Sequence, residues 1–103
     1  MSTIDQLIEH LRSFQKRKSM YVRYATVEAV EAFLTGFRIG RHGMGLEIDR
    51  DLEWATEAAR GWKQSAAGPV PQMKSQGLSD NEIMDELIEI EIDILQELAK
   101  RLA

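Results

Sequence analysis

Residue types that could do chemistry are few and scattered in this chain. It contains no cysteine, and its two histidines, His10 and His42, lack a neighbour at the spacing of a metal-binding motif such as HExxH. No serine lies in a GxSxG nucleophile elbow, and the glycines of residues 40–45 do not match the GxGxxG pattern of a dinucleotide loop. We therefore predict no catalytic residue, no metal site and no cofactor, and we expect that the protein is not an enzyme.

The densest set of functional groups is an acidic run near the carboxyl-terminal end. Residues 80–97 include no basic side chain but many carboxylates, namely Asp80, Glu82, Asp85, Glu86, Glu89, Glu91, Asp93 and Glu97. Carboxylates bind divalent cations, but the di-metal sites of helix bundles also use a Glu-x-x-His motif, which is absent from this run. The pattern is more typical of a solvated, acidic helix face.

The element that positions these carboxylates is predicted to be a long helix. Ser79 and Glu82 have the spacing of a capping box, and Leu78 and Ile83 occupy the positions of a hydrophobic staple. The stretch IEIEIDI at residues 88–94 alternates as a strand does, so a strand over 87–95 is the alternative. No helix breaker separates this stretch from the cap before it or from the helix-favouring residues after it, which favours one continuous helix.

Two positions on this helix break its amphipathic pattern. Glu91 falls within the apolar face, and we expect it to be a buried carboxylate that requires a hydrogen-bonding or positively charged partner. Ile92 falls among the acidic residues, and we expect it to be an exposed apolar anchor. The side chains that could reach Glu91 are His10, Arg17, Tyr21 and Arg38.

Helical periodicity recurs in the rest of the chain and predicts an all-α protein. We expect a compact bundle of about four helices in a single domain, residues 1–103, with one long loop that contains proline and glycine. The expected helices start at Ser2 or Thr3, at Thr26, at Asp49 or Asp51, and at Ser79. The second is expected to end at Gly40, the third at about Gln64, and the long loop to cover Ser65–Gly77.

Charge is distributed unevenly along the chain, whose formal net charge is −4. Basic residues dominate the amino-terminal part and acidic residues the closing helix, which suits either internal pairing of the two ends or a basic partner on the acidic face. The basic segment 16–23, interleaved with Tyr21 and Tyr24, could contact nucleic acid or pair internally, but the overall acidity disfavours nucleic acid. No signal peptide or membrane-length apolar run is visible, so we expect a cytoplasmic protein with no membrane partner.

The stretch from residue 12 to residue 40 contains a recognisable pattern. A helix that ends in basic residues is followed by Arg17-Lys18-Ser19-Met20-Tyr21-Val22 and then by a helix that contains Phe33-Leu34-Thr35-Gly36-Phe37. Residues 12–40 thereby resemble small helical bacterial immunity proteins of polymorphic and contact-dependent toxin systems. Lys18-Ser19 stands where that pattern usually has Pro-Gly, and Arg23 stands where a glycine usually follows.

The resemblance implies an immunity protein that neutralises a cognate toxin domain by direct binding. A basic nuclease would be a suitable partner for an acidic surface. The resemblance also implies that Arg17, Met20, Tyr21 and Gly36 have structural roles. The residues expected to contact the partner are Glu82, Asp85, Glu86, Glu89, Ile92 and Asp93. The alternative is a helical homo-oligomer, for example a homodimer, or an adaptor without a toxin partner.

Overall fold

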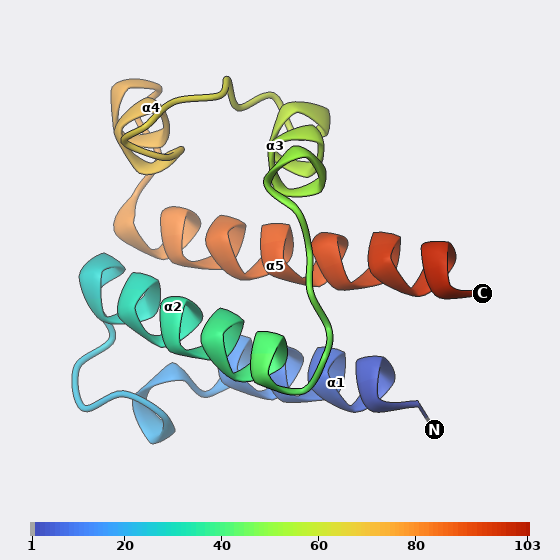
Figure 1. The fold of residues 1–103 in the computed structure, drawn as a ribbon. Coiled ribbons are helices and arrows are strands. Elements are labelled where there is room, and N and C mark those ends of the chain that lie inside the picture. The colour runs from blue at the N-terminus through green and yellow to red at the C-terminus, as the bar shows by residue number, and fades with distance from the viewer. Residues whose placement is uncertain (1) are drawn as a thin grey trace.

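The computed structural model describes residues 2–103, which form five α-helices and one short 3-10 helix (Figure 1). The all-α class is therefore confirmed. The elements are α1 (Thr3–Lys16), η1 (Lys18–Met20), α2 (Val27–Gly43), α3 (Arg50–Ala59), α4 (Val70–Ser75) and α5 (Asp80–Leu102). No helix within the described residues has both the length and the apolar composition needed to cross a bilayer.

Helix α5 lies in the middle of the molecule and contacts most of the other elements. Figure 1 shows α3 and α4 on one side of it and α1 and α2 on the other. Its start is fixed as predicted: the Ser79 hydroxyl accepts from the backbone N–H of Glu82 at 3.2 Å, and the Glu82 carboxylate accepts from the N–H of Ser79 at 2.9 Å. Residues 87–95 are helical throughout, so the predicted helix is confirmed and the strand alternative is wrong.

The core is one cluster that α5 shares with α1, α2 and α4. At its α1–α2 end, the ring of Phe14 stacks on Phe33 with 4.0 Å between centroids, and Tyr21 meets Phe14 edge-on at 5.4 Å. The Tyr21 hydroxyl also donates to the Ser13 hydroxyl at 2.9 Å. These contacts hold the turn after α1 in place, because the Tyr21 ring packs against Phe14 and its hydroxyl is hydrogen-bonded to Ser13.

Two helix ends differ from the prediction. Helix α2 continues beyond Gly40 to Gly43 and ends where Gly45 takes a φ of 81°. Helix α3 ends at Ala59 instead of about Gln64, because Gly61 takes a φ of 95° and the N–H of Trp62 donates back to the carbonyl of Glu57 at 3.0 Å. Both ends use a glycine in the left-handed region just past the helix, the usual helix-ending conformation.

Part of the predicted loop, residues 65–77, is the short helix α4. The prolines of this segment lie at the start of that helix, since Pro69 is the N-cap residue of α4 and Pro71 lies in its first turn. A proline in the first helical turn loses no hydrogen bond, because the N–H there has no partner within the helix. Val70 and Met73 of α4 are buried against the core, which explains why the segment is ordered as a helix.

Candidate functional site

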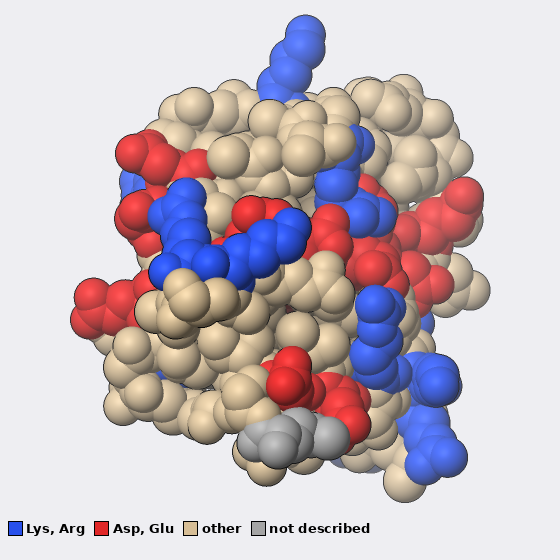
Figure 2. Space-filling view, turned by 90° about the vertical axis from the view of Figure 1, so that its right-hand side faces the viewer, with Lys and Arg blue, Asp and Glu red and all other residues tan. Residues whose placement is uncertain are grey.

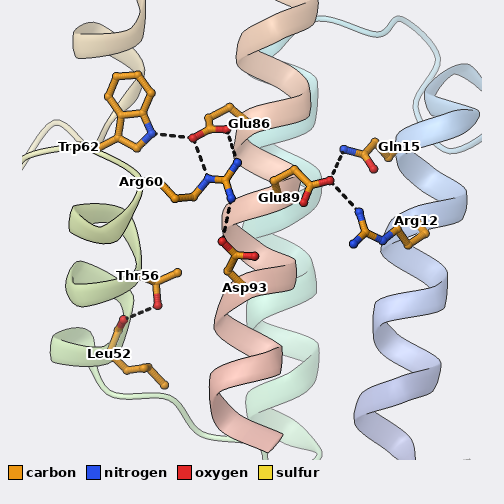
Figure 3. A network of polar contacts seen from close by, with 9 residues as sticks. All are labelled: Arg12, Gln15, Leu52, Thr56, Arg60, Trp62, Glu86, Glu89 and Asp93. Atoms are coloured by element: carbon orange, nitrogen blue, oxygen red, sulfur yellow. Dashed lines mark hydrogen bonds and ion pairs between the residues drawn. The ribbon is translucent and has the colours of Figure 1, made fainter. Parts of the chain in front are cut away.

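The candidate site is a row of carboxylates on the outward side of α5, which we call the acidic strip: Glu82, Asp85, Glu86, Glu89 and Asp93. The structure does bring these predicted residues together on one side of the helix. Figure 3 shows three of them, Glu86, Glu89 and Asp93, between α1 on one side and the end of α3 on the other. Ionised side chains from both neighbours reach across to the strip.

Arg60, which follows α3, joins two of these carboxylates. Its Nη2 and Nε atoms lie 2.7 and 2.8 Å from the two oxygens of Glu86, and its Nη1 lies 2.8 Å from Asp93 (Figure 3). The indole N–H of Trp62 donates to the same Glu86 carboxylate at 2.8 Å. The hydrogen bonds from Arg60, assisted by that from Trp62, lower the pKa of Glu86, and the bond to Glu86 raises the pKa of Arg60.

Helix α1 and the turn after it supply the partners on the other side of α5. Glu89 accepts from Arg12 at 2.7 Å and from Gln15 at 3.1 Å (Figure 3), and Asp85 accepts from Lys18 at 2.7 Å. The basic segment 16–23 thus pairs internally only in part. Lys18 pairs with α5, whereas Lys16, Arg17 and Arg23 are exposed and form no ion pair with any residue from 2 to 103.

The acidic strip is therefore a network of ion pairs and not a uniformly anionic surface. Figure 2 shows the same mixing on the side where α5 ends, where basic and acidic side chains lie beside one another. Glu82 is occupied by the helix cap, and its hydrogen bonds with the Ser79 backbone and hydroxyl lower its pKa. Among the paired members, Asp85 is the most accessible, with 51% of its side chain exposed.

Ile92 does not belong to this surface, and the prediction that it is an exposed anchor is wrong. Its side chain is fully buried within the core cluster. Ile92 lies one turn after Glu89, which contacts α1, so that both residues face the α1 side of the helix. The buried arc of α5 is wide because neighbours cover the helix from two sides, and Ile92 lies within that arc.

The predicted burial of Glu91 is confirmed, since none of its side chain is exposed. Of the expected partners, Arg38 is correct: its Nε donates to Glu91 Oε1 at 2.5 Å. Burial by itself would lower the pKa of Arg38, but the adjacent Glu91 carboxylate outweighs it, so the pKa is raised. His10 is exposed, and neither Arg17 nor Tyr21 pairs with Glu91 among the described residues.

Sequence reasoning missed a second arginine at this buried site. Arg41 lies one turn beyond Arg38 on α2, is only 4% exposed, and places Nη2 at 3.5 Å from Glu91 and 3.7 Å from Glu53. Glu57 also faces Arg38, and burial raises the pKa of that carboxyl. The spacing of two arginines three residues apart on α2 was the available signal, because such residues lie on one helix face.

The described residues do not bring together three or more metal-ligating side chains. His42 lies 3.5 Å from Glu47, and both side chains point largely into solvent. The acidic strip of α5 presents carboxylates that are held by ion pairs.

The four residues with implied structural roles differ in their surroundings. Tyr21 packs on Phe14 as described, but Met20 is 76% exposed and Arg17 is exposed and unpaired within residues 2–103. Gly36 lies on the outward side of α2, and a Cβ added there would meet nothing within 4 Å. Among the described residues, no neighbouring element therefore packs closely against Gly36.

Comparison with known proteins gives no further guide. No family model matches this chain, and no curated protein and no solved structure is significantly similar to it.

We predict that the stabilisation contributed by the Arg60 network is lost in acid. The pKa of Glu86 is lower in the folded protein than in the unfolded chain, where it is about 4.5. The contribution of Glu86 to the free energy of unfolding is therefore fully present above pH 4.5, and it is lost as the pH falls through the folded-state pKa. Arg60→Met should cost about 2 kcal/mol at neutral pH, with the difference from wild type narrowing below about pH 4.5. Urea unfolding at a series of pH values measures this. A difference in unfolding free energy between Arg60→Met and wild type that stayed constant down to pH 3 would contradict this prediction.

Proposed function

We propose that this chain is a binding protein of the immunity type, which neutralises a toxin domain by direct contact through the acidic strip. The observation that supports the proposal is that ion pairs hold the carboxylates of the strip in fixed positions. Arg12, Lys18 and Arg60 fix four carboxylates in place, so little side-chain freedom remains to be lost on binding. The resemblance of residues 12–40 to immunity proteins supports the same function.

The charge balance of the strip favours a basic partner. Five carboxylates face three cations, and the difference leaves two negative charges on this side of α5. A basic toxin domain, such as a nuclease with a phosphate-binding cleft, would be attracted over a distance and then oriented by the fixed carboxylates. Ile92 takes no part in this contact, because it is buried.

The experiment starts from the chain's own genetic neighbourhood. Each adjacent open reading frame is expressed in a bacterial host with and without this protein, and growth is followed. We expect one of these products to arrest growth, the arrest to be relieved by co-expression, and the two proteins to elute together in size-exclusion chromatography. A toxic neighbour that is not relieved and does not co-elute would refute the proposal, and so would a neighbourhood without any toxic product.

The surface is tested with neutral, isosteric changes. Asp85→Asn with Glu89→Gln should weaken binding to that toxin by about a hundredfold or more, since each of the two lost contacts between close charges contributes about 1.5 kcal/mol or more and about 1.4 kcal/mol corresponds to a factor of ten. The matched control is Glu28→Gln with Glu31→Gln, which removes the same charge from exposed positions on α2. Lysine is avoided at Glu89 because it would face Arg12 directly. Equal weakening in both double variants would show that net charge, and not the strip, determines binding.

A second candidate, self-association, is favoured by the exposed apolar residues near the end of α2. Ile39 is 69% exposed and Met44 is 54% exposed. Apolar side chains of this size on a surface are often found where proteins associate. Sedimentation velocity over a range of concentrations distinguishes this candidate, because a homo-oligomer would show a mass that increases with concentration, whereas the immunity proposal does not require one.

A further inference from the structure

The turn between α1 and α2 carries a surface of the opposite sign to the acidic strip. No acidic residue occurs between Glu9 and Glu28, although the protein as a whole is acidic. Of the cations in this stretch, Arg12 and Lys18 are engaged by α5. The remaining ones, Lys16, Arg17 and Arg23, form no ion pair within residues 2–103 and are exposed.

Exposed apolar and aromatic side chains lie among these unpaired cations. Met20 is 76% exposed and Tyr24 is 68% exposed, and the guanidinium of Arg23 lies 5.4 Å from the centre of the Tyr24 ring. Tyrosine, methionine and arginine are enriched in protein–protein interfaces, and tyrosine and arginine provide many of their strongest contacts. We call this surface the basic corner: Lys16, Arg17, Met20, Tyr21, Arg23 and Tyr24.

One residue of the basic corner, Tyr21, is held in place, and the corner adjoins a hollow. Tyr21 is fixed by its packing on Phe14 and Phe33 and by its hydrogen bond to Ser13. Ser13 in turn lines a shallow hollow of about 280 Å³ on α1, together with Glu9, Arg12, Lys16 and Arg17. Three of its five lining residues are cationic and one is acidic, so that the hollow suits a carboxylate side chain better than a basic one.

We propose that the basic corner is a docking surface for an acidic segment of a partner protein. Carboxylates of that segment would meet Lys16, Arg17 and Arg23, and its apolar residues would meet Met20 and Tyr24. This surface goes beyond the proposed function, which uses the acidic strip and a basic partner. The two surfaces meet at the Lys18–Asp85 pair. The corner and the strip are therefore neighbouring surfaces of opposite charge.

A protein partner fits the corner better than nucleic acid does. Only three unpaired cations, Lys16, Arg17 and Arg23, lie in the basic corner. Nucleic-acid affinity arises mainly from many phosphate contacts, which a surface of this size does not supply. The large exposure of Met20 adds an apolar contact, which suits a protein surface better than a sugar–phosphate chain.

The test uses two fluorescent probes on the full chain at low and at physiological salt. One is a peptide of alternating glutamate and leucine, and the other is an oligouridylate of the same net charge. We expect saturable anisotropy changes with the peptide and at least about tenfold weaker binding of the oligouridylate. Raising the salt should weaken the peptide complex, because its charged contacts are exposed. Tighter binding of the oligouridylate would overturn the proposal in favour of a nucleic-acid site.

Matched variants locate the site. Arg17→Glu with Arg23→Glu should weaken peptide binding by at least about tenfold, while Lys63→Glu with Lys74→Glu, the same charge change at exposed positions elsewhere, should change it less than about twofold. Tyr24→Ala should also weaken it, and Met44→Ala should not. Equal losses in the two charge variants, or no saturable binding by the wild type, would overturn the proposal. Circular dichroism confirms that each variant is folded, and neither outcome depends on the toxin experiment.

Discussion

Glu91→Gln is expected to destabilise the protein by about 3 kcal/mol, because removing one partner of a buried ion pair leaves an uncompensated charge. Arg41 is only 4% exposed and would keep only the more distant Glu53, at 3.7 Å, as a counter-charge. Arg38 would lose the carboxylate to which it donates. At roughly 4–8 °C for each kcal/mol in a domain of this size, the melting temperature should fall by roughly 12–24 °C, measurable by circular dichroism.

The matched control for this change is Glu89→Gln. Glu89 also pairs with an arginine, but its side chain is 28% exposed and that of Arg12 is 45% exposed. Water and salt screen such a pair, so its loss should cost less than about 1 kcal/mol. If the two variants melted at the same temperature, the three-residue cluster of Glu91, Arg38 and Arg41 would not be the buried charge centre that its geometry indicates.

The sequence indicates the helices well because their signals are local. Capping residues such as Ser79 and Thr26 and the spacing of apolar residues lie within a turn or two of each other, and both caps form in the structure. The burial of Glu91 also follows from local periodicity, since the residue lies among apolar neighbours. The starts of these helices and the burial of Glu91 could therefore be predicted from the sequence, whereas the ends of α2 and α3 were predicted wrongly.

Features that depend on how the helices are arranged could not be predicted from local sequence patterns. Arg60 was overlooked, although Glu86 and Asp93 lie two turns apart on one side of α5, a spacing that one long cation can bridge. The pairing of Arg12 with Glu89 joins residues that are 77 positions apart, and no local pattern encodes it. The wrong prediction of a loop over residues 65–77 has another cause, because Pro71 lies in the first turn of α4, where proline is compatible with a helix.

The position of α5 connects these findings. A helix with one neighbour buries a single stripe, and its opposite side is solvated. Helix α5 has neighbours on two sides, so its buried arc is broader and its polar side is narrow and flanked by cations from both neighbours (Figure 3). The same arrangement therefore explains why Ile92 is buried and why the acidic strip is internally paired. Both features were expected to form a binding surface open to solvent.

Ile92→Ala tests that arrangement directly. Because Ile92 is fully buried, removing its outer carbons should leave a cavity and cost about 2–5 kcal/mol. Were it an exposed residue on the acidic face, the same change would alter stability by no more than about 0.5 kcal/mol. Chemical unfolding in urea measures the difference, and the urea dependence of the unfolding free energy should stay unchanged.

The matched control is Ile39→Ala, the same substitution at a helical position that is 69% exposed. It should leave the free energy of unfolding within about 0.5 kcal/mol of wild type, because the side chain is largely in water in both states. The large effect at Ile92 and the small one at Ile39 follow from the two-sided covering of α5. If the two variants were equally stable, Ile92 would face solvent, and it would have to be returned to the acidic strip as its apolar contact.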